Sequence, residues 1–207
     1  TSDSVRLPAT PDQARRAVAD LATGKNRVDL IKVVQERGGP RRSLEPIAPD
    51  VLRAIVGEAH ARGLRVAAHW GTREDLEDVL AAGVDDLEHL ESRGVAEGWP
   101  KGTLTAIVSR DVSLTPTLTV TEVAMPEQDH RLLLQRLGEF HRAGGRVVAG
   151  TDSGMPGVHF GASMSRELEL LVESGLSARE ALRSATSEAA RVLRADDLGA
   201  IEPGHAA

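Results

Sequence analysis

The stretch RVAAHWGTREDLEDVLAAGVDDLEHL, residues 65–90, decides the fold. It begins with a short apolar run of strand length, RVAAHW, and ends with a second one, VDDLEHL. Between them, Thr72 is a helix N-cap with Asp75 three residues later, and Gly83 is a stop signal. Strand, helix and strand in this order predict a βα repeat with parallel strands. His69 and His89 lie where these two strands give way to polar residues.

The same alternation continues in both directions along the chain. Further strand-like runs lie at 27–34, 111–118 and 146–150. Helical segments are expected at 9–22, 49–61, 102–110, 128–143, 163–174 and 178–193, the last with Ser177 and Glu180 as a capping box. Five strand-like runs separated by helices predict an α/β fold with a parallel sheet. We expect one domain, residues 1–207, because no linker or change of composition interrupts the pattern.

A complete eight-unit barrel takes about 250 residues, and this chain of 207 residues supplies about five βα units. The pattern therefore indicates either an open sheet with helices on both faces or part of a TIM-type (β/α) barrel with C-terminal helices.

The composition limits which partners and metal ligands the protein can have. The net charge is -6 and no basic stripe is present, so nucleic acid is not an expected partner. No apolar run reaches the roughly 20 residues of a membrane helix, so no membrane is expected either. The chain has no cysteine, so a bound metal would take nitrogen and oxygen ligands. The compartment is not fixed by these features, and a cytoplasmic location is our working expectation.

Four side chains in or directly after the strand-like runs could carry chemistry: Lys32, His69, His89 and Asp152. Each has a structural interpretation when taken alone, such as a lysine that reaches solvent, a core histidine or an Asx turn. Together they match the carboxyl ends of barrel strands, where catalytic groups lie. Imidazole and carboxylate suit Zn²⁺ or Mn²⁺, and a lysine carbamate could bridge two ions. The joint pattern predicts a metal-dependent enzyme.

The other five histidines have weaker signals. His60 and His141 fall near helix C-termini, where a structural role is expected because a cationic ring complements the helix dipole. His130 and His205 lie in polar segments and are expected to be exposed. His159 follows the last strand-like run in a loop that would overlie a barrel site, so it is a candidate for substrate binding.

Several motifs in order resemble the amidohydrolase superfamily, most closely its branch of imidazolonepropionase-like enzymes and Xaa-Pro dipeptidases. They are IKV at 31–33, EAHARGLRVAAHW at 58–70, AGVDDLEH at 82–89, AGTDSG at 149–154 and GLSAREALRSATSEAARVL at 175–193. The resemblance implies that Lys32, often carboxylated in that family, bridges two metals. It implies that His69 and His89 are metal ligands, and that Asp152 binds metal and carries a proton. The implied cofactor is a divalent metal, zinc by expectation, as one or two ions.

The activity implied by the resemblance is hydrolysis of a carbon–nitrogen bond by a metal-bound hydroxide. The substrate would be a small amide, dipeptide or cyclic amide. The family's first barrel strand carries a His-x-His pair, which this sequence lacks, and strands of the family's β-sandwich domain are also missing. We therefore expect a fragment covering barrel strands four to eight. Its apolar strand edges would favour a homo-oligomer.

Two alternatives remain open at this point. Lys32 could act as the nucleophile of a Schiff-base barrel enzyme, although this leaves the two histidines and the aspartate without a joint role. The chain could also be a non-catalytic barrel piece that serves binding or assembly, which the missing His-x-His pair favours.

Overall fold

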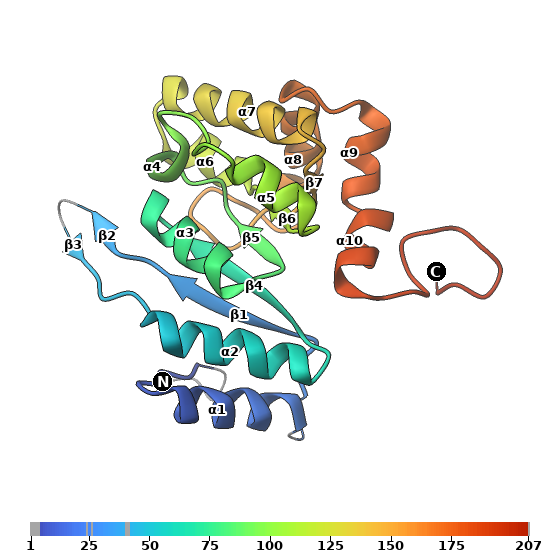
Figure 1. Cartoon of the computed structure of the whole chain (residues 1–207). Coiled ribbons are helices and arrows are strands. Elements are labelled where there is room, and N and C mark those ends of the chain that lie inside the picture. The colour runs from blue at the N-terminus through green and yellow to red at the C-terminus, as the bar shows by residue number, and fades with distance from the viewer. Residues whose placement is uncertain (1–4, 24, 26, 40–41, 207) are drawn as a thin grey trace. The chain divides into compact units, whose positions relative to one another are not determined.

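The computed structural model describes residues 5–23, 25, 27–39 and 42–206 (Figure 1). Residues 40 and 41, in the polar loop that follows the first expected strand, and Ala207 of the expected domain lie outside these ranges. The chain divides into two compact units, Thr1–Asp86 and Leu87–Ala207. Within the described ranges, no helix is both long and apolar enough to cross a membrane.

The first unit alternates helices with strands. Its elements are α1 (Pro11–Thr23), β1 (Leu30–Gln35), β2 (Gly38–Gly39), β3 (Arg42–Ser43), α2 (Pro49–Ala61), β4 (Arg65–Trp70) and α3 (Arg73–Ala82). Strand β1 runs parallel to β4, with Lys32 opposite Ala67 and Val34 opposite His69. Strands β2 and β3 form a small antiparallel pair that the sequence pattern did not predict.

Local chemistry explains where the helices of this unit begin and end. Pro49 opens α2, where its missing N–H costs nothing. Helix α3 begins directly after its N-cap Thr72 as expected, and Thr72 and Asp75 form a capping box there, with side chain and backbone bonded in both directions. Gly83 ends α3 with a φ of 90°, a left-handed conformation that favours glycine.

Apolar packing holds these elements together. Helix α1 packs on α2, and both α2 and α3 contact β4. Leu52 and Ala59 of α2 and Val66 and Trp70 of β4 are all fully buried or nearly so. Burial of such side chains contributes roughly 1.5–3 kcal/mol each for the larger ones, which makes this packing the main source of stability in the unit.

The second unit begins within the third strand of the βα series. Its elements are β5 (Asp86–Glu88, whose first residue ends the first unit), α4 (Ser92–Val95), α5 (Thr103–Ser109), β6 (Ser113–Thr115), α6 (Leu118–Ala124), α7 (Glu127–Arg142), β7 (Arg146–Val147), α8 (Ala162–Glu173), α9 (Ala178–Ser184) and α10 (Ser187–Leu193). Strands β5, β6 and β7 are neighbours in that order, and β6 runs parallel to β7. The α/β class and the five βα repeats predicted from sequence are confirmed.

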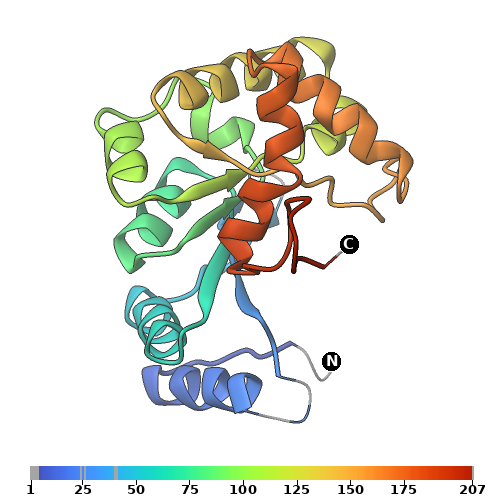
Figure 2. The same cartoon turned by 90° about the vertical axis from the view of Figure 1, so that its right-hand side faces the viewer.

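The segment 178–193, expected to form one helix, forms two successive helices, α9 and α10, with a break between them (Figure 2). Ser177 and Glu180 form the predicted capping box at the start of α9. The break falls at Thr186, whose φ and ψ of -128° and -97° are not helical. Its hydroxyl donates to the carbonyl of Leu182, so the side chain offers the backbone an alternative to a continuous helix.

Candidate active site

Lys32 and His69 lie on the same face of the β1–β4 pair. The register places Val34 opposite His69, and residues two apart on a strand share a face, so Lys32, Val34 and His69 are on one side. On this side of β1, Lys32 is exposed and Val34 is 59% exposed, whereas Ile31 and Val33 on the other side are buried. Strand β1 continues beyond Lys32 to Gln35, so this lysine lies within the strand and not at its end.

Glu36, directly after β1, contacts His69 at the end of β4. Its Oε2 lies 3.1 Å from Nε2 of His69, and both side chains are largely shielded from solvent. Sequence reasoning missed Glu36, because the QER run reads as the start of a polar loop. The signal that could have found Glu36 is an acidic residue directly after one buried strand, where the next strand of the pattern has a histidine near its end.

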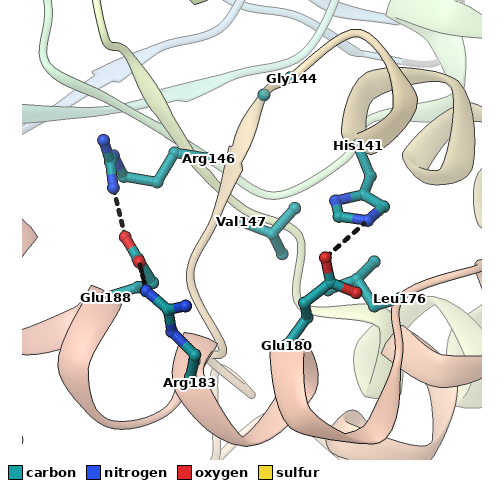
Figure 3. A pocket seen from close by; sticks show the side chains of 9 residues that line it. His141, Gly144, Arg146, Val147, Leu176, Glu180, Arg183 and Glu188 are labelled. Carbon is teal, nitrogen blue, oxygen red and sulfur yellow. Dashed lines mark hydrogen bonds and ion pairs between the residues drawn. The ribbon is translucent and has the colours of Figure 1, made fainter.

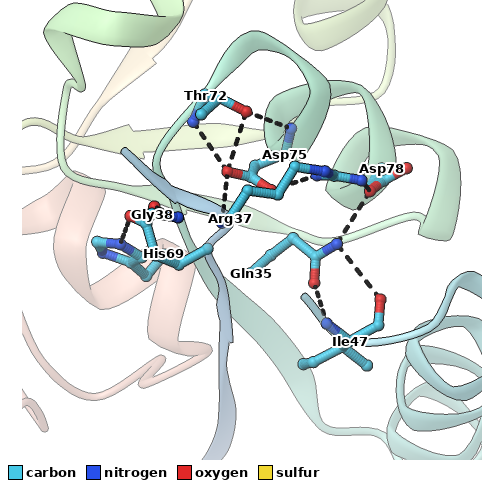
Figure 4. Close-up of polar contacts among 9 residues, drawn as sticks. Gln35, Arg37, Gly38, Ile47, His69, Thr72, Asp75 and Asp78 are labelled. Atoms are coloured by element: carbon cyan, nitrogen blue, oxygen red, sulfur yellow. Dashed lines mark hydrogen bonds and ion pairs between the residues drawn. The ribbon is translucent and has the colours of Figure 1, made fainter. Parts of the chain in front are cut away.

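The residues on both sides of Glu36 are anchored (Figure 4). The Gln35 side chain is fully buried and bonds the backbone of Ile47 twice, accepting from its N–H and donating to its carbonyl. The Arg37 guanidinium forms ion pairs with Asp75 and Asp78 of α3. The hydrogen bonds that Arg37 donates to the carboxylates of Asp78 and Asp75 hold its pKa above the usual value, although burial acts in the opposite direction. The segment after β1 is therefore fixed to the loop before α2 and to α3.

His89 lies just beyond β5, in the second unit. Its φ of 70° is left-handed, so the backbone turns out of the strand at this residue. The alternation of side chains along the strand therefore ends at Glu88. The N–H of His89 donates to the carbonyl of Thr115, and its Nδ1 lies 3.0 Å from Oγ1 of Thr117.

A buried carboxylate holds the loop that contains Thr117. Glu167 of α8 is fully buried, and its two oxygens accept hydrogen bonds from the N–H groups of Leu118 and Thr119 at 2.9 and 2.8 Å. Burial raises the pKa of Glu167 to about 7, although the two backbone donors act in the opposite direction. The Thr119 hydroxyl also donates to the carbonyl of Thr151, which precedes Asp152.

Asp152 and His159 belong to one loop that follows β7. Asp152 is exposed and has a φ of 50°. The loop is closed by its own backbone, since the N–H of Met155 bonds the carbonyl of Asp152 and the N–H of Gly154 bonds that of Val158. His159 is exposed on the same loop, as a substrate contact requires. Whether it has that role stays a prediction.

Three successive strands of this unit are followed by a non-glycine residue in the left-handed region. These residues are His89 after β5, Thr117 after β6 and Asp152 after β7, with φ values of 70°, 50° and 50°. Such conformations cost of the order of 1–3 kcal/mol each and cluster at functional sites. Asp111 before β6 and Arg194 after α10 are left-handed as well, so this backbone strain is present at the carboxyl ends of the strands but not confined to them.

Two of the remaining histidines are structural, as expected. His60 in the last turn of α2 lies 2.9 Å from the Asp85 carboxylate, and His141 in the last turn of α7 lies 3.6 Å from Glu180. His205 at the C-terminal end is 26% exposed at its side chain and lies 4.0 Å from Glu202.

His130 corrects another expectation. It is only 7% exposed, not exposed as its polar sequence neighbours suggested, because α7 packs on α6. The Thr121 hydroxyl donates to the carbonyl of Leu118 and lies 2.9 Å from Nδ1 of His130. Burial lowers the pKa of His130, so the neutral ring is favoured.

A cavity of about 240 Å³ lies at the amino end of β7 (Figure 3). Arg146 and Arg183 both pair with Glu188 there, and His141 lies near Glu180. Asp152 follows the opposite, carboxyl end of the same strand. The charged groups of the cavity neutralise one another, so we assign it a structural role.

The donors at the carboxyl ends of the strands are of the type that a divalent metal accepts. They are imidazole nitrogens and carboxylate oxygens, and the chain has no thiol. Across the described ranges, no group of three or more His, Cys, Asp or Glu side chains is arranged to hold a metal ion. The chemical types of these donors therefore fit a metal such as Zn²⁺. The assignment of Lys32, His69, His89 and Asp152 as its ligands stays a prediction.

Comparison with known proteins points to one family. The model of the amidohydrolase family matches residues 9–207. An uncharacterized protein of Mycobacterium bovis is 29% identical over 209 residues, covering 92% of this chain and 52% of that protein.

Solved structures with the same fold include two with peptidase names. A Xaa-Pro dipeptidase with bound methionine in its active site matches with a TM-score of 0.75 and 25% identity, over 96% of this chain and 51% of that one. A candidate prolidase from Bifidobacterium longum matches with a TM-score of 0.76 and 29% identity, over 98% of this chain and 54% of that one. The chain thus spans about half the length of the proteins it matches.

Proposed function

Because this chain belongs to the amidohydrolase family, we propose that the whole protein is a metal-dependent hydrolase of carbon–nitrogen bonds. The observation that carries the proposal is the position of His69 and His89, one near the end of β4 and one directly after β5. Catalytic groups of α/β barrels lie at these strand ends. The Xaa-Pro dipeptidase and the candidate prolidase among the similar structures support a dipeptide or related small amide as substrate.

We assign the metal to Lys32, His69, His89 and Asp152, with Lys32 as a carbamate. Zinc suits this set because nitrogen and oxygen donors are supplied and thiolates are not. When bound, such an ion polarises a carbonyl and makes water nucleophilic at neutral pH. The protein's own contribution is to hold the donors and to manage the proton.

Asp152 is the residue that we assign to proton transfer. Hydrolysis adds the oxygen of water to the carbonyl carbon, breaks the carbon–nitrogen bond and places a proton on the leaving nitrogen. An exposed carboxylate on a closed loop can take the proton from water and deliver it to that nitrogen. His159 on the same loop is the candidate substrate contact.

Metal content tests the ligand assignment directly. The 207-residue chain is dialysed with zinc, and bound metal is measured by elemental analysis for wild type, His69→Ala and His89→Ala. Each variant should lose most of its bound zinc. The matched control is His141→Ala, which removes an imidazole near Glu180 at a helix end. Equal zinc in wild type and in both site variants would contradict the assignment.

Activity is tested on the whole protein with a panel of Xaa-Pro dipeptides and other small amides. We expect hydrolysis that a chelator abolishes and zinc restores. Trapping of Lys32 by borohydride with a carbonyl substrate would support the Schiff-base alternative instead. Absence of hydrolysis in the whole, metal-loaded protein across such a panel would favour a binding or assembly role.

A further inference from the structure

We propose that Glu36 is a positioning residue for His69, holding the imidazole through a contact with its Nε2. The proposal rests on the proposed function, since it concerns a ligand of the same site. Glu36 was not among the residues that the sequence pattern indicated, and the contact arises only from the register of β1 on β4.

The contact favours a His69 ring that donates from Nε2. The Glu36 carboxylate, which can only accept hydrogen bonds, lies 3.1 Å from Nε2 of His69. The two side chains are 14% and 22% exposed, so water competes weakly for the contact. A neutral imidazole that donates from Nε2 has its lone pair on Nδ1. Carboxylates that orient a ligating histidine in this way are worth roughly 10–100-fold in metal affinity.

The carboxylate is held on its other sides as well. Its Oε1 accepts a hydrogen bond from the N–H of Gly38 at 2.5 Å. Gly71, two residues after His69, leaves the space that the carboxylate occupies, because a Cβ on Gly71 would lie 2.2 Å from Oε2 of Glu36. The absence of a side chain at Gly71 is therefore required by this position of Glu36.

The chain around Glu36 is anchored without it. Gln35 is bonded to the backbone of Ile47, and Arg37 is paired with Asp75 and Asp78. These contacts tie the segment on both sides of Glu36, to the loop before α2 and to α3 (Figure 4). Removal of the Glu36 carboxylate should consequently leave the segment in place and act on His69.

The test compares wild type with Glu36→Ala and Glu36→Gln. Glu45→Gln is the matched control, because Glu45 is an exposed acid nine residues further along the same segment. The first readout needs no metal: ¹⁵N chemical shifts of the His69 ring report which nitrogen carries the proton. We expect the Nε2–H tautomer in wild type and in Glu45→Gln, and a mixture of tautomers in Glu36→Ala.

The second readout is zinc affinity, measured by competition with a chelating dye. We expect Glu36→Ala to bind zinc roughly 10–100-fold more weakly than wild type. Glu36→Gln should fall between them, because its amide oxygen can still accept from Nε2. Amide NMR spectra that overlay for all variants show that the chain remains folded.

The outcomes separate this proposal from the function on which it rests. An unchanged His69 tautomer with equal zinc affinity in all variants would overturn the role of Glu36 and leave the metal site standing. A tautomer change in a chain that binds no zinc in any form would support the contact and contradict the assignment of metal ligands within this chain.

Discussion

The hydroxyl of Thr117 lies 3.0 Å from Nδ1 of His89, and both residues have a left-handed backbone. At His69 the protein partner is on the other ring nitrogen, Nε2, where Glu36 lies. The two candidate ligands are thus oriented through opposite nitrogens.

Thr117→Val tests this relationship at His89. Valine keeps the branched shape and the strained backbone of threonine but has no hydroxyl, so only the contact with Nδ1 is lost. We expect zinc affinity to fall roughly tenfold, at the lower end of effects for partners of ligating histidines. Competition titration with a chelating dye measures it.

Thr119→Val is the control for this substitution. Thr119 is also buried, and the contacts of its side chain are with the carbonyl of Thr151 and the Glu167 carboxylate. Its zinc affinity should match wild type. The same loss in both variants would show that any packing change in the loop weakens binding, and the specific role of Thr117 would be wrong.

Glu167→Ala should destabilise the second unit strongly. The substitution leaves the N–H groups of Leu118 and Thr119 without their buried acceptor and opens a cavity. We expect a loss of about 3 kcal/mol in the free energy of unfolding, measured in urea. Glu169→Ala on the same helix removes only a surface ion pair with Arg166 and should cost less than about 1 kcal/mol. Similar costs for the two variants would contradict the anchoring role.

His130 should make stability depend on pH. Burial lowers its pKa in the folded chain, so the unfolded chain binds more protons as pH falls below about 6.5. This contribution to stability is present above that pH and is lost below it. His130→Asn removes the titrating group while an amide can still meet the Thr121 hydroxyl. Urea unfolding from pH 7.5 to 5.5 should show a steeper fall for wild type than for the variant. Parallel pH profiles would mean that His130 titrates alike in both states.

His159→Ala tests the loop after β7 in the whole enzyme. If the exposed ring contacts substrate, kcat/KM should fall about tenfold, the value of one polar contact, while bound metal stays unchanged. A panel of dipeptides and small amides is the appropriate assay. Identical kinetic constants across that panel would leave His159 as an ordinary surface residue.

Local chemistry made much of the fold predictable. The helix start at Thr72 and the capping box of Ser177 with Glu180 each depend on four consecutive residues, and both form as expected. The strands that carry Lys32 and His69 were also found, because a short apolar run between helices has few other interpretations.

Contacts between distant residues were not predictable. Glu36 meets His69 across 33 residues through strand register, and Glu167 reaches Leu118 across 49. The burial of His130 depends on how α7 packs on α6, which its polar neighbours in sequence do not reveal. The residues that support the candidate ligands are therefore the part of the site that only the structure supplies.

Substitutions at the left-handed residues after β5, β6 and β7 are expected to change stability and activity in opposite directions. Glycine or asparagine would relieve much of the backbone cost at His89, Thr117 and Asp152. A library of variants selected only for resistance to heat should therefore accumulate these two residues at the three positions. A library selected for turnover should retain the original side chains, and sequencing both pools would map the active site without an assay of any single variant.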